Sequence, residues 1–192
     1  LSLAMLVFMK DFGMALLFMS IFVALMYMAT ARGVYVLAGA GLFAAAGAIA
    51  LNVVPHVQDR FRVWLDPWPY AETTGYQLLQ SLFTIADGGI LGAGIGRGYL
   101  LFPDKTPVVP DLQTDFIFTA VANEMGLLGA VGVILVYLLF VWCGFRIAVY
   151  APDGFSKLLA AGLAAAFAPQ TFIIIGGVTR VIPLTGITLP FV

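Results

Sequence analysis

The chain is poor in charge, in cysteine and in histidine. Only 10% of its 192 residues are charged, whereas about a quarter are charged in ordinary soluble domains. Basic and acidic residues are nearly balanced, nine against ten, so the basic patch typical of nucleic-acid-binding proteins is absent. Cys143 is the single cysteine and His56 the single histidine, which excludes an intrachain disulfide and a zinc site built from these residues.

Apolar sequence is what the chain has in quantity, since 62% of its residues are hydrophobic. Four uncharged runs are each long enough to cross the roughly 30 Å hydrocarbon core of a bilayer. They cover residues 12–30, 33–55, 125–145 and 158–179. We therefore predict an all-α fold, a polytopic bundle of transmembrane helices.

The beginning of the sequence indicates a piece of a longer protein. Leu1–Met9 is apolar but too short to span, and we interpret it as the end of a helix that starts outside the sequence. Lys10 and Asp11 would then lie at a membrane edge, where charged flanks set the depth of a helix. We expect residues 1–192 to form a single integral membrane domain that is incomplete at both ends.

Two carboxylates stand where the second half of the chain turns apolar. Asp111 and Asp115 lie in the stretch Pro110–Phe118, and apart from Glu124 the sequence after Asp115 is uncharged as far as Phe145. A carboxylate at the mouth of an apolar run costs free energy unless it has a partner or a task. Asp115 could cap the helix that follows it, or it could do chemistry, and the spacing alone leaves both open.

A polar stripe and a glycine-rich stretch separate the two apolar halves. Gln77, Gln80, Ser81 and Thr84 recur at helical spacing, and such a face should point to the bundle interior or to a wet groove. The glycines that follow match neither dinucleotide-binding nor Walker patterns, which excludes a nucleotide site of those kinds. We predict that Gly75–Gly96 crosses the membrane as a broken helix lining a cavity.

Counting the apolar runs predicts the sidedness of the loops. With Lys10 in the cytoplasm, the second run returns there, so Arg60 and Arg62 are expected to be cytoplasmic, as the positive-inside rule prefers. If the run that ends at Arg146 also ends in the cytoplasm, Asp115 lies outside. The sequence therefore predicts one large extracytoplasmic loop that carries Asp115.

Several of these stretches resemble the SEDS (FtsW/RodA/SpoVE) family. Pro110–Phe118, followed by Ala122–Gly129, is similar to the family signature "HTDFIF…EELGLxG", with Gln113 in place of His and Asn123 in place of the first Glu. The remaining resemblances follow the family's order along the chain. They are Lys10–Gly13 with "PDLGTA", Arg62–Trp68 with "R…xLDPW", Gly75–Leu82 with "GYQxxQSL", Ile85–Gly96 with "IGSGGLFGxGLG", and Arg180–Val192 with "GLLPxTGxxLPFxSYGGSS".

The resemblance implies a peptidoglycan glycosyltransferase that polymerises lipid II into glycan strands at the outer face of the bacterial plasma membrane. The chain would be part of the C-terminal half of a roughly ten-helix protein, and alone it would be inactive. Asp115 matches the family's proposed catalytic residue and would act as general base. Glu124 would be a structural interior carboxylate, paired with another helix. The candidate substrate-binding residues are Gln77, Gln80, Ser81, Arg97, Lys105 and Arg180.

The leaving pyrophosphate needs positive charge, from these Arg and Lys side chains or from a divalent cation such as Mg²⁺ or Mn²⁺. No metal ligand set is assigned and no other cofactor is implied. The implied partners are lipid II, the lipid-linked glycan, the bilayer and a crosslinking transpeptidase of the class B penicillin-binding proteins, with no nucleic acid. A flippase of a lipid-linked precursor and a non-catalytic scaffold of the division or elongation machinery remain alternatives. The sequence does not separate elongation, division and sporulation members.

Overall fold

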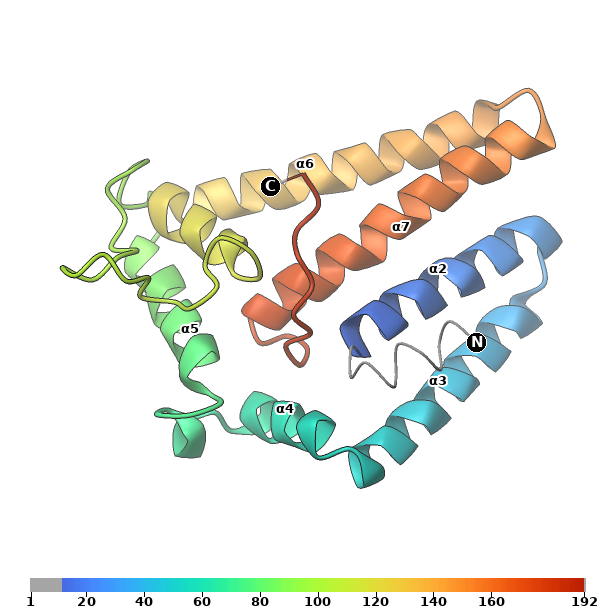
Figure 1. Ribbon diagram of the computed structural model, residues 1–192. Helices are drawn as coiled ribbons and strands as arrows, with labels where there is room; N and C mark the ends of the chain where they lie inside the picture. Colours follow the sequence, from blue (N-terminus) through green and yellow to red (C-terminus); the bar gives the residue numbers. More distant parts are fainter. Residues whose placement is uncertain (1–11, 192) are drawn as a thin grey trace. The chain divides into compact units, whose positions relative to one another are not determined.

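The chain folds into helices and the connections between them (Figure 1). The computed structural model describes residues 12–191, so the expected helix end at Leu1–Met9 and the flank Lys10–Asp11 lie outside the described residues. Within residues 12–191 the strand-like pairing is one isolated bridge, between Leu101 and Pro107. The elements are α2 (Phe12–Thr30), α3 (Gly33–Val53), α4 (Pro55–Leu65), the 3-10 helix η1 (Trp68–Tyr70), α5 (Tyr76–Gly88), α6 (Ile117–Tyr150) and α7 (Gly154–Val178).

Four of these helices, α2, α3, α6 and α7, are long and apolar enough to cross a membrane. They have 19, 21, 34 and 25 residues, and at about 1.5 Å per residue such lengths suit the hydrocarbon core. No residue of α3 is buried, as expected for an apolar helix that faces lipid or further helices. The predicted all-α, polytopic membrane fold is confirmed.

The prediction that Gly75–Gly96 crosses the membrane is wrong. The only helix in that stretch, α5, has 13 residues and ends at Gly88, and it is not among the candidate spans of the described chain. At about 1.5 Å per residue it reaches roughly 20 Å, less than the hydrocarbon thickness. Arg60 precedes this stretch and Asp115 follows it, and both lie within 4 Å of the Cβ position of Gly186, so the connection between them makes no net crossing of the membrane.

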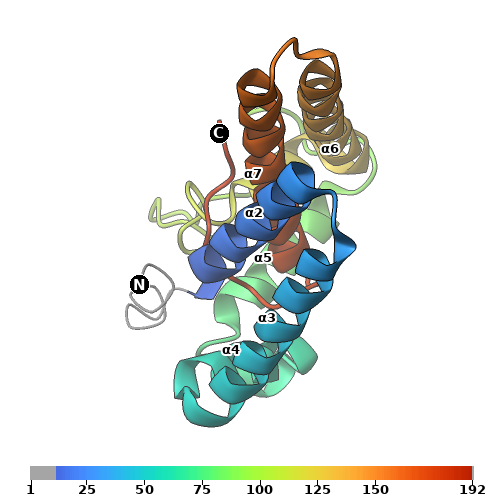
Figure 2. The ribbon, with the colours of Figure 1, turned by 90° about the vertical axis from the view of Figure 1, so that its right-hand side faces the viewer.

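The chain divides into two compact units. The first contains Leu1–Gln58 and Tyr137–Thr171. In it α2 packs along α3, as Figures 1 and 2 both show, and glycines allow close approach. A side-chain carbon on Gly144 would lie 2.9 Å from Cβ of Ala164, so α6 and α7 touch there almost backbone to backbone. Small residues at such contacts are typical of membrane helix pairs.

The second unit contains Asp59–Val136 and Phe172–Val192, and it carries the polar half of the chain. Its core joins the loop before α6, the first turns of α6 and the end of α7. The polar stripe of α5 packs on α6 and not on lipid: Ser81 and Thr119 share a hydrogen bond of 2.7 Å, and both are fully buried. The buried core residues are Val109, Leu112, Phe116, Phe118, Ala122, Ala130 and Val178.

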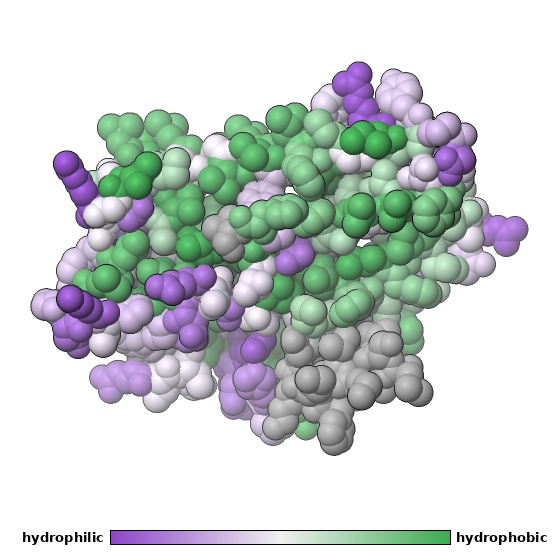
Figure 3. Space-filling view, turned by 45° about the horizontal axis from the view of Figure 1, so that its top comes forward, coloured by the Kyte–Doolittle hydropathy of each residue, from purple (hydrophilic) through white to green (hydrophobic). Residues whose placement is uncertain are grey.

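The exposed surface is rich in apolar side chains, which Figure 3 shows as broad green areas. On α6 alone Leu135, Val136, Leu138 and Leu139 each expose more than half of their surface. Apolar exposure on this scale is far beyond that of a monomeric soluble protein. It is the surface expected of helices that lie among lipid and other apolar helices.

A kink divides α6 at Gly126, whose backbone takes φ 67° and ψ −170°. The kink interrupts the helical hydrogen bonds, and the glycine-rich loop after α5 replaces them. The N–H groups of Ala93 and Gly94 donate to the carbonyls of residues 123 and 124, at 3.0 and 2.9 Å, and those of Leu127 and Leu128 donate to the carbonyls of residues 89 and 90. Buried backbone groups need such partners. A side chain on Gly126 would collide with backbone atoms of this loop.

We expect Gly126→Ala to destabilise the protein and Gly132→Ala to be neutral or slightly stabilising. Gly126 combines a positive φ with contact to the backbone of Ile90, so an added methyl should cost about 1–3 kcal/mol. Gly132 lies in the same helix with nothing within 4 Å of its Cβ position, and alanine there should gain up to roughly 1 kcal/mol of helix propensity. Thermal unfolding of the detergent-solubilised protein measures both. Equal melting temperatures for the two variants would contradict the role given to the loop.

Candidate functional site

Asp115 lies in a tight turn just before α6 begins. The carbonyl of Asp111 accepts the N–H groups of Thr114, Asp115 and Phe116, at 3.1, 3.1 and 3.3 Å. Asp111 has φ +56°, a left-handed conformation that aspartate tolerates better than most residues. Leu112 and Phe116 are buried in the core, which anchors the turn. The chain is thereby held so that the Asp115 side chain is half-buried at the edge of the unit.

Asp115 does not act as a helix cap in this structure. Within residues 12–191 no backbone N–H donates to its carboxylate, and α6 starts two residues later, at Ile117. The hydroxyl of Thr114 donates to the Asp111 carbonyl, at 3.2 Å, and so stabilises the turn. The alternative interpretation of Asp115, as the cap of α6, therefore lacks the hydrogen bond that would support it.

The surroundings of Asp115 raise the pKa of its carboxyl above the ordinary value. Burial is the main cause, and the negative charge of Asp111 is the second, while the Thr114 hydroxyl and the positive charge of Arg60 act in the opposite direction. A carboxylate with a raised pKa is a stronger proton acceptor at neutral pH than a fully solvated one. Asp115 thus has the electrostatics expected of a general base.

Arg60, on α4, is the cation next to Asp115. Its Nη1 donates to the carbonyls of Leu184 and Thr185, at 3.2 and 3.0 Å. The expectation that Arg60 lies on the opposite membrane face from Asp115 is wrong. The parity count failed because it included a crossing at Gly75–Gly96 that the structure does not contain. Arg62, on the same helix, pairs with Asp59 at 3.6 Å.

Gln77 contacts the site through Asp111. Its Nε2 donates to Oδ2 of Asp111 at 3.0 Å, so α5 fixes the carboxylate that raises the pKa of Asp115. Gln80, one turn further along α5, is half-buried. Ser81 has no exposed surface, and its hydroxyl is engaged with Thr119. The expectation that Ser81 binds substrate is therefore not met, because the side chain is used for helix packing.

Arg180 holds the end of α4. Its Nε donates to the carbonyl of Trp64 at 2.8 Å and its Nη2 to that of Leu65 at 2.7 Å, while the Trp64 indole donates back to the Arg180 carbonyl. Arginine commonly satisfies the last carbonyls of a helix in this way. These bonds give Arg180 a structural task that the sequence did not indicate.

Arg97 and Lys105 are exposed in the loop between α5 and α6. Neither contributes to the electrostatic environment of Asp115, for which Arg60 is the cation. Lys105 occupies a turn with φ +66°, between the residues of the isolated bridge. The structure does not bring these two predicted phosphate contacts to the site.

Glu124 does not show the partner that the sequence predicted. Glu124 is half-buried on the short part of α6 before the kink, and its Cγ lies beside Gly98. Within residues 12–191 Glu124 has no ion pair, so the expected pairing with another helix is not found there.

No group of three or more His, Cys, Asp or Glu residues in the described chain could hold a metal ion. The divalent cation therefore stays a prediction, and no step is assigned to one.

Asn123 lies fully buried beside Glu124. Its Nδ2 donates to the carbonyl of Thr84 at 2.7 Å, which fastens α5 to α6. Its Oδ1 has no hydrogen-bond partner within the described residues and lies against Gly98. Asn123, one of the two departures from the family signature, is thus a packing residue.

The sequence missed Arg60, Asp111 and Gly186 as residues of the site. Arg60 was assigned to the wrong side of the membrane. Asp111 acts on Asp115 without a shared helix, because a turn brings its charge close. Gly186 is distant in sequence, and its Cβ position lies 3.5 Å from Oδ2 of Asp115. The signal for Asp111 was its spacing of four residues before Asp115.

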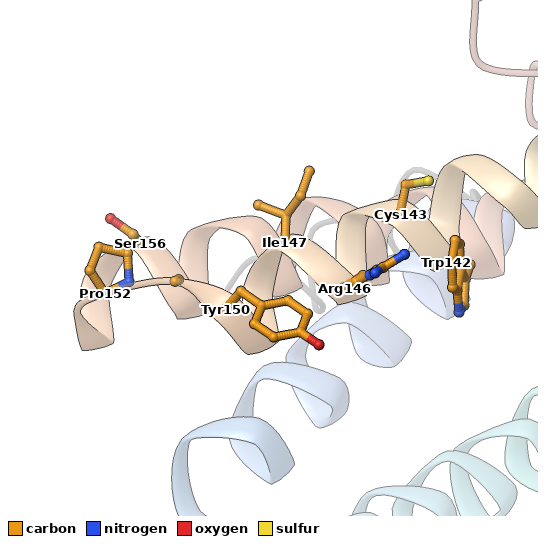
Figure 4. Close-up of a pocket in the computed structure, with 8 residues that line it drawn as sticks. Trp142, Cys143, Arg146, Ile147, Tyr150, Pro152 and Ser156 are labelled. Carbon is orange, nitrogen blue, oxygen red and sulfur yellow. The ribbon is translucent and has the colours of Figure 1, made fainter.

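A pocket of about 560 Å³ lies elsewhere, in the first unit, where α6 turns into α7 (Figure 4). Arg146 lies over the rings of Trp142 and Tyr150, at 5.2 and 6.0 Å from their centroids. The lining of the pocket contains no carboxylate and no histidine. Arginine and aromatic residues are usual at a membrane surface. The Asp115 turn remains the candidate site.

Comparison with known proteins identifies relatives along the whole chain. The model of the FtsW/RodA/SpoVE family, described as cell cycle protein, matches residues 1–192. Peptidoglycan glycosyltransferase RodA of Mycobacterium tuberculosis is 45% identical over 190 residues, 99% of this chain and 39% of that protein. Stage V sporulation protein E of Bacillus subtilis is 38% identical over 152 residues, 79% of this chain and 40% of that protein.

A solved structure matches as well. It is described as "Structural coordination of polymerization and crosslinking by a peptidoglycan synthase complex", and the TM-score is 0.73 with 27% sequence identity. The match covers 98% of this chain and 51% of that one. The chain thus spans between about 40% and about half of the length of these three proteins.

We expect two substitutions to move the pKa of Asp115 in opposite directions. Asp111→Asn removes a negative charge and should lower the pKa, while asparagine tolerates the positive φ and can still accept the hydrogen bond of Gln77. Arg60→Gln removes a positive charge and should raise it. Carboxyl carbon NMR of isotope-labelled aspartate, followed as a function of pH, measures both. Shifts of the same sign would contradict the charge arrangement described here.

Proposed function

Because the chain belongs to the FtsW/RodA/SpoVE family of cell cycle proteins, we propose that it forms the catalytic part of a peptidoglycan glycosyltransferase that polymerises lipid II. The name of the Mycobacterium tuberculosis relative supports the reaction class. The observation that carries the proposal is the half-buried Asp115, with Asp111 and Arg60 acting on it from opposite directions. The activity is that of a whole protein of which this chain covers the part with the site.

The proposed reaction transfers a glycan from one lipid carrier to another lipid-linked sugar. A hydroxyl of the acceptor lipid II attacks the anomeric carbon of the donor glycan, and a new glycosidic C–O bond forms. The bond between that carbon and the pyrophosphate oxygen breaks, and its electron pair leaves with the lipid pyrophosphate. Asp115 accepts the hydroxyl proton, which makes a weak nucleophile effective. The reaction therefore requires one base to accept the proton and a positive charge near the leaving pyrophosphate.

Arg60 is the residue we propose for that positive charge. It is the cation in the electrostatic environment of Asp115, and a guanidinium remains charged at any physiological pH. Its bonds to the carbonyls of Leu184 and Thr185 restrict its position, which reduces the entropy lost when a phosphate binds. Gln77 and Gln80, on the same unit, are retained as candidates for contacts to the sugars.

We infer that the Asp115 loop faces outward. Basic residues do not decide the side, because they flank the short connections (Arg32, Arg146, Lys157) and also the ends of the long one (Arg60, Arg62). The outward side is proposed from the function, because the polymerised sugars belong outside the plasma membrane. The short connections between α2 and α3 and between α6 and α7 then lie in the cytoplasm, and α2 begins outside, contrary to the starting assumption of the sequence-based count. The long connection from 54 to 116 is on the other side, since α3 and α6 each cross once. The sugars of lipid II would then meet Asp115 at the outer surface.

A crosslinking transpeptidase of the class B penicillin-binding proteins is the proposed partner. The matching solved structure is described as a complex that coordinates polymerization and crosslinking, which supports a partner of that kind. The flippase alternative depended partly on a broken membrane helix at Gly75–Gly96, and the structure has a short packed helix there. Assignment to elongation, division or sporulation stays open, because named relatives include RodA and a sporulation protein.

We expect Asp115→Asn to reduce glycan-strand formation by at least about 100-fold, the usual effect of losing a general base. The matched control is Glu124→Gln, which removes a carboxylate that makes no ion pair in the described chain and should retain activity. The measurement supplies labelled lipid II to the full-length protein purified with its transpeptidase, after checking membrane insertion of each variant. Polymer formation by Asp115→Asn at the parental rate would reject Asp115 as the base and favour a flippase or scaffold.

A further inference from the structure

Gly186 occupies a position between the base and the cation of the candidate site. It lies in the extended segment that follows α7, drawn in dark red in Figure 1, and it has φ +70°. A Cβ atom built on it would lie 3.5 Å from Oδ2 of Asp115 and 3.8 Å from Nη2 of Arg60. Beyond its chain neighbours, no third heavy atom of the described residues comes within 4 Å of that point.

The segment around Gly186 is held in place on both sides. Arg60 binds the two carbonyls that precede it, at 3.2 and 3.0 Å. After it, Ile187 and Leu189 are buried, at 6% and 3% exposure, whereas Gly186 itself is exposed. Gly186 is therefore fixed in position and open to solvent. The space that a side chain would fill there lies within van der Waals reach of a carboxylate oxygen of Asp115 and a guanidinium nitrogen of Arg60.

The proposed reaction needs these two groups within a few ångströms of each other. The attacking hydroxyl must come within hydrogen-bond distance of the base, and an oxygen of the pyrophosphate must reach a cation at the same moment. A molecule at the point beside Gly186 would contact both groups. A methyl group there would occupy space that a sugar hydroxyl or phosphate oxygen requires.

We propose that Gly186 forms the floor of the subsite in which the acceptor sugar hydroxyl meets Asp115 and the donor pyrophosphate meets Arg60, so that its missing side chain is a requirement of substrate binding. This inference rests on the glycosyltransferase function proposed above. The competing explanation is purely conformational: a left-handed turn favours glycine wherever it occurs. A test must therefore separate the space that a side chain fills from the backbone strain that it causes.

Gly96 is a matched control for that strain. It is also an exposed glycine of the second unit, with φ +73°, and nothing lies within 4 Å of its Cβ position. Alanine at either position meets a similar positive φ, whereas only at Gly186 does it approach Asp115 and Arg60. Asparagine is the second substitution, since it tolerates a positive φ better than alanine and adds more volume.

The experiment measures lipid II polymerisation and melting temperature for Gly186→Ala, Gly186→Asn, Gly96→Ala and Gly96→Asn in the full-length protein with its transpeptidase. We expect similar melting temperatures for each matched pair. We expect the Gly96 variants to stay close to the parental rate and Gly186→Asn to lose about 100-fold, the cost of displacing a reacting group by roughly 1 Å. Gly186→Ala should raise KM for lipid II and, by excluding water from Asp115, shift the acid limb of the rate profile to higher pH.

The outcomes separate the two proposals. If Gly186→Asn polymerises as fast as Gly96→Asn, or if both lose activity equally, the subsite is rejected while loss of activity in Asp115→Asn still supports the glycosyltransferase. If Asp115→Asn polymerises at the parental rate, the proposed function itself fails. Should Gly186→Asn not fold, Gly186→Ala decides by its KM and pH profile, because a purely structural role would leave the acid limb unchanged.

Discussion

The candidate site depends on the contacts of the Arg60 guanidinium. It reaches from α4 to the carbonyls of Leu184 and Thr185, and so joins two segments more than a hundred residues apart in the chain. The same side chain acts on the charge of Asp115. Burial favours the neutral form of a carboxylate, whereas a base must be ionised to accept a proton. Arg60 supports that ionisation while Asp111 and burial keep the base strong.

Around this contact, the second unit holds irregular backbone in place by satisfying its polar groups. The loop after α5 supplies hydrogen bonds where Gly126 breaks α6, and Arg180 supplies them where α4 ends. The turn before α6 closes on the Asp111 carbonyl. The turn places Asp115 between a polar loop and the apolar helix α6, and the other two sets of hydrogen bonds stabilise elements of the same unit.

The sequence alone predicted the features that depend on local composition. The four long apolar helices follow from uncharged runs of sufficient length, because crossing a bilayer requires about 20 apolar residues. Asp115 stood out because a carboxylate at the start of an apolar run costs free energy unless it has a partner or a function. The polar stripe on α5 was correctly expected to face inward, although Ser81 turned out to be a packing contact with Thr119.

Tertiary structure decided what depends on contacts between distant segments. Whether Gly75–Gly96 crosses the membrane depended on how α5 packs, and the error moved Arg60 to the wrong side of the bilayer. The neighbourhood of Arg60, Asp115 and Gly186 has no local signature, because a turn, a helix and an extended segment meet there. Composition therefore determined which segments enter the membrane and which carboxylate is exceptional. Only the fold decided which charges surround that carboxylate, because electrostatic effects depend on distance in space and not along the chain.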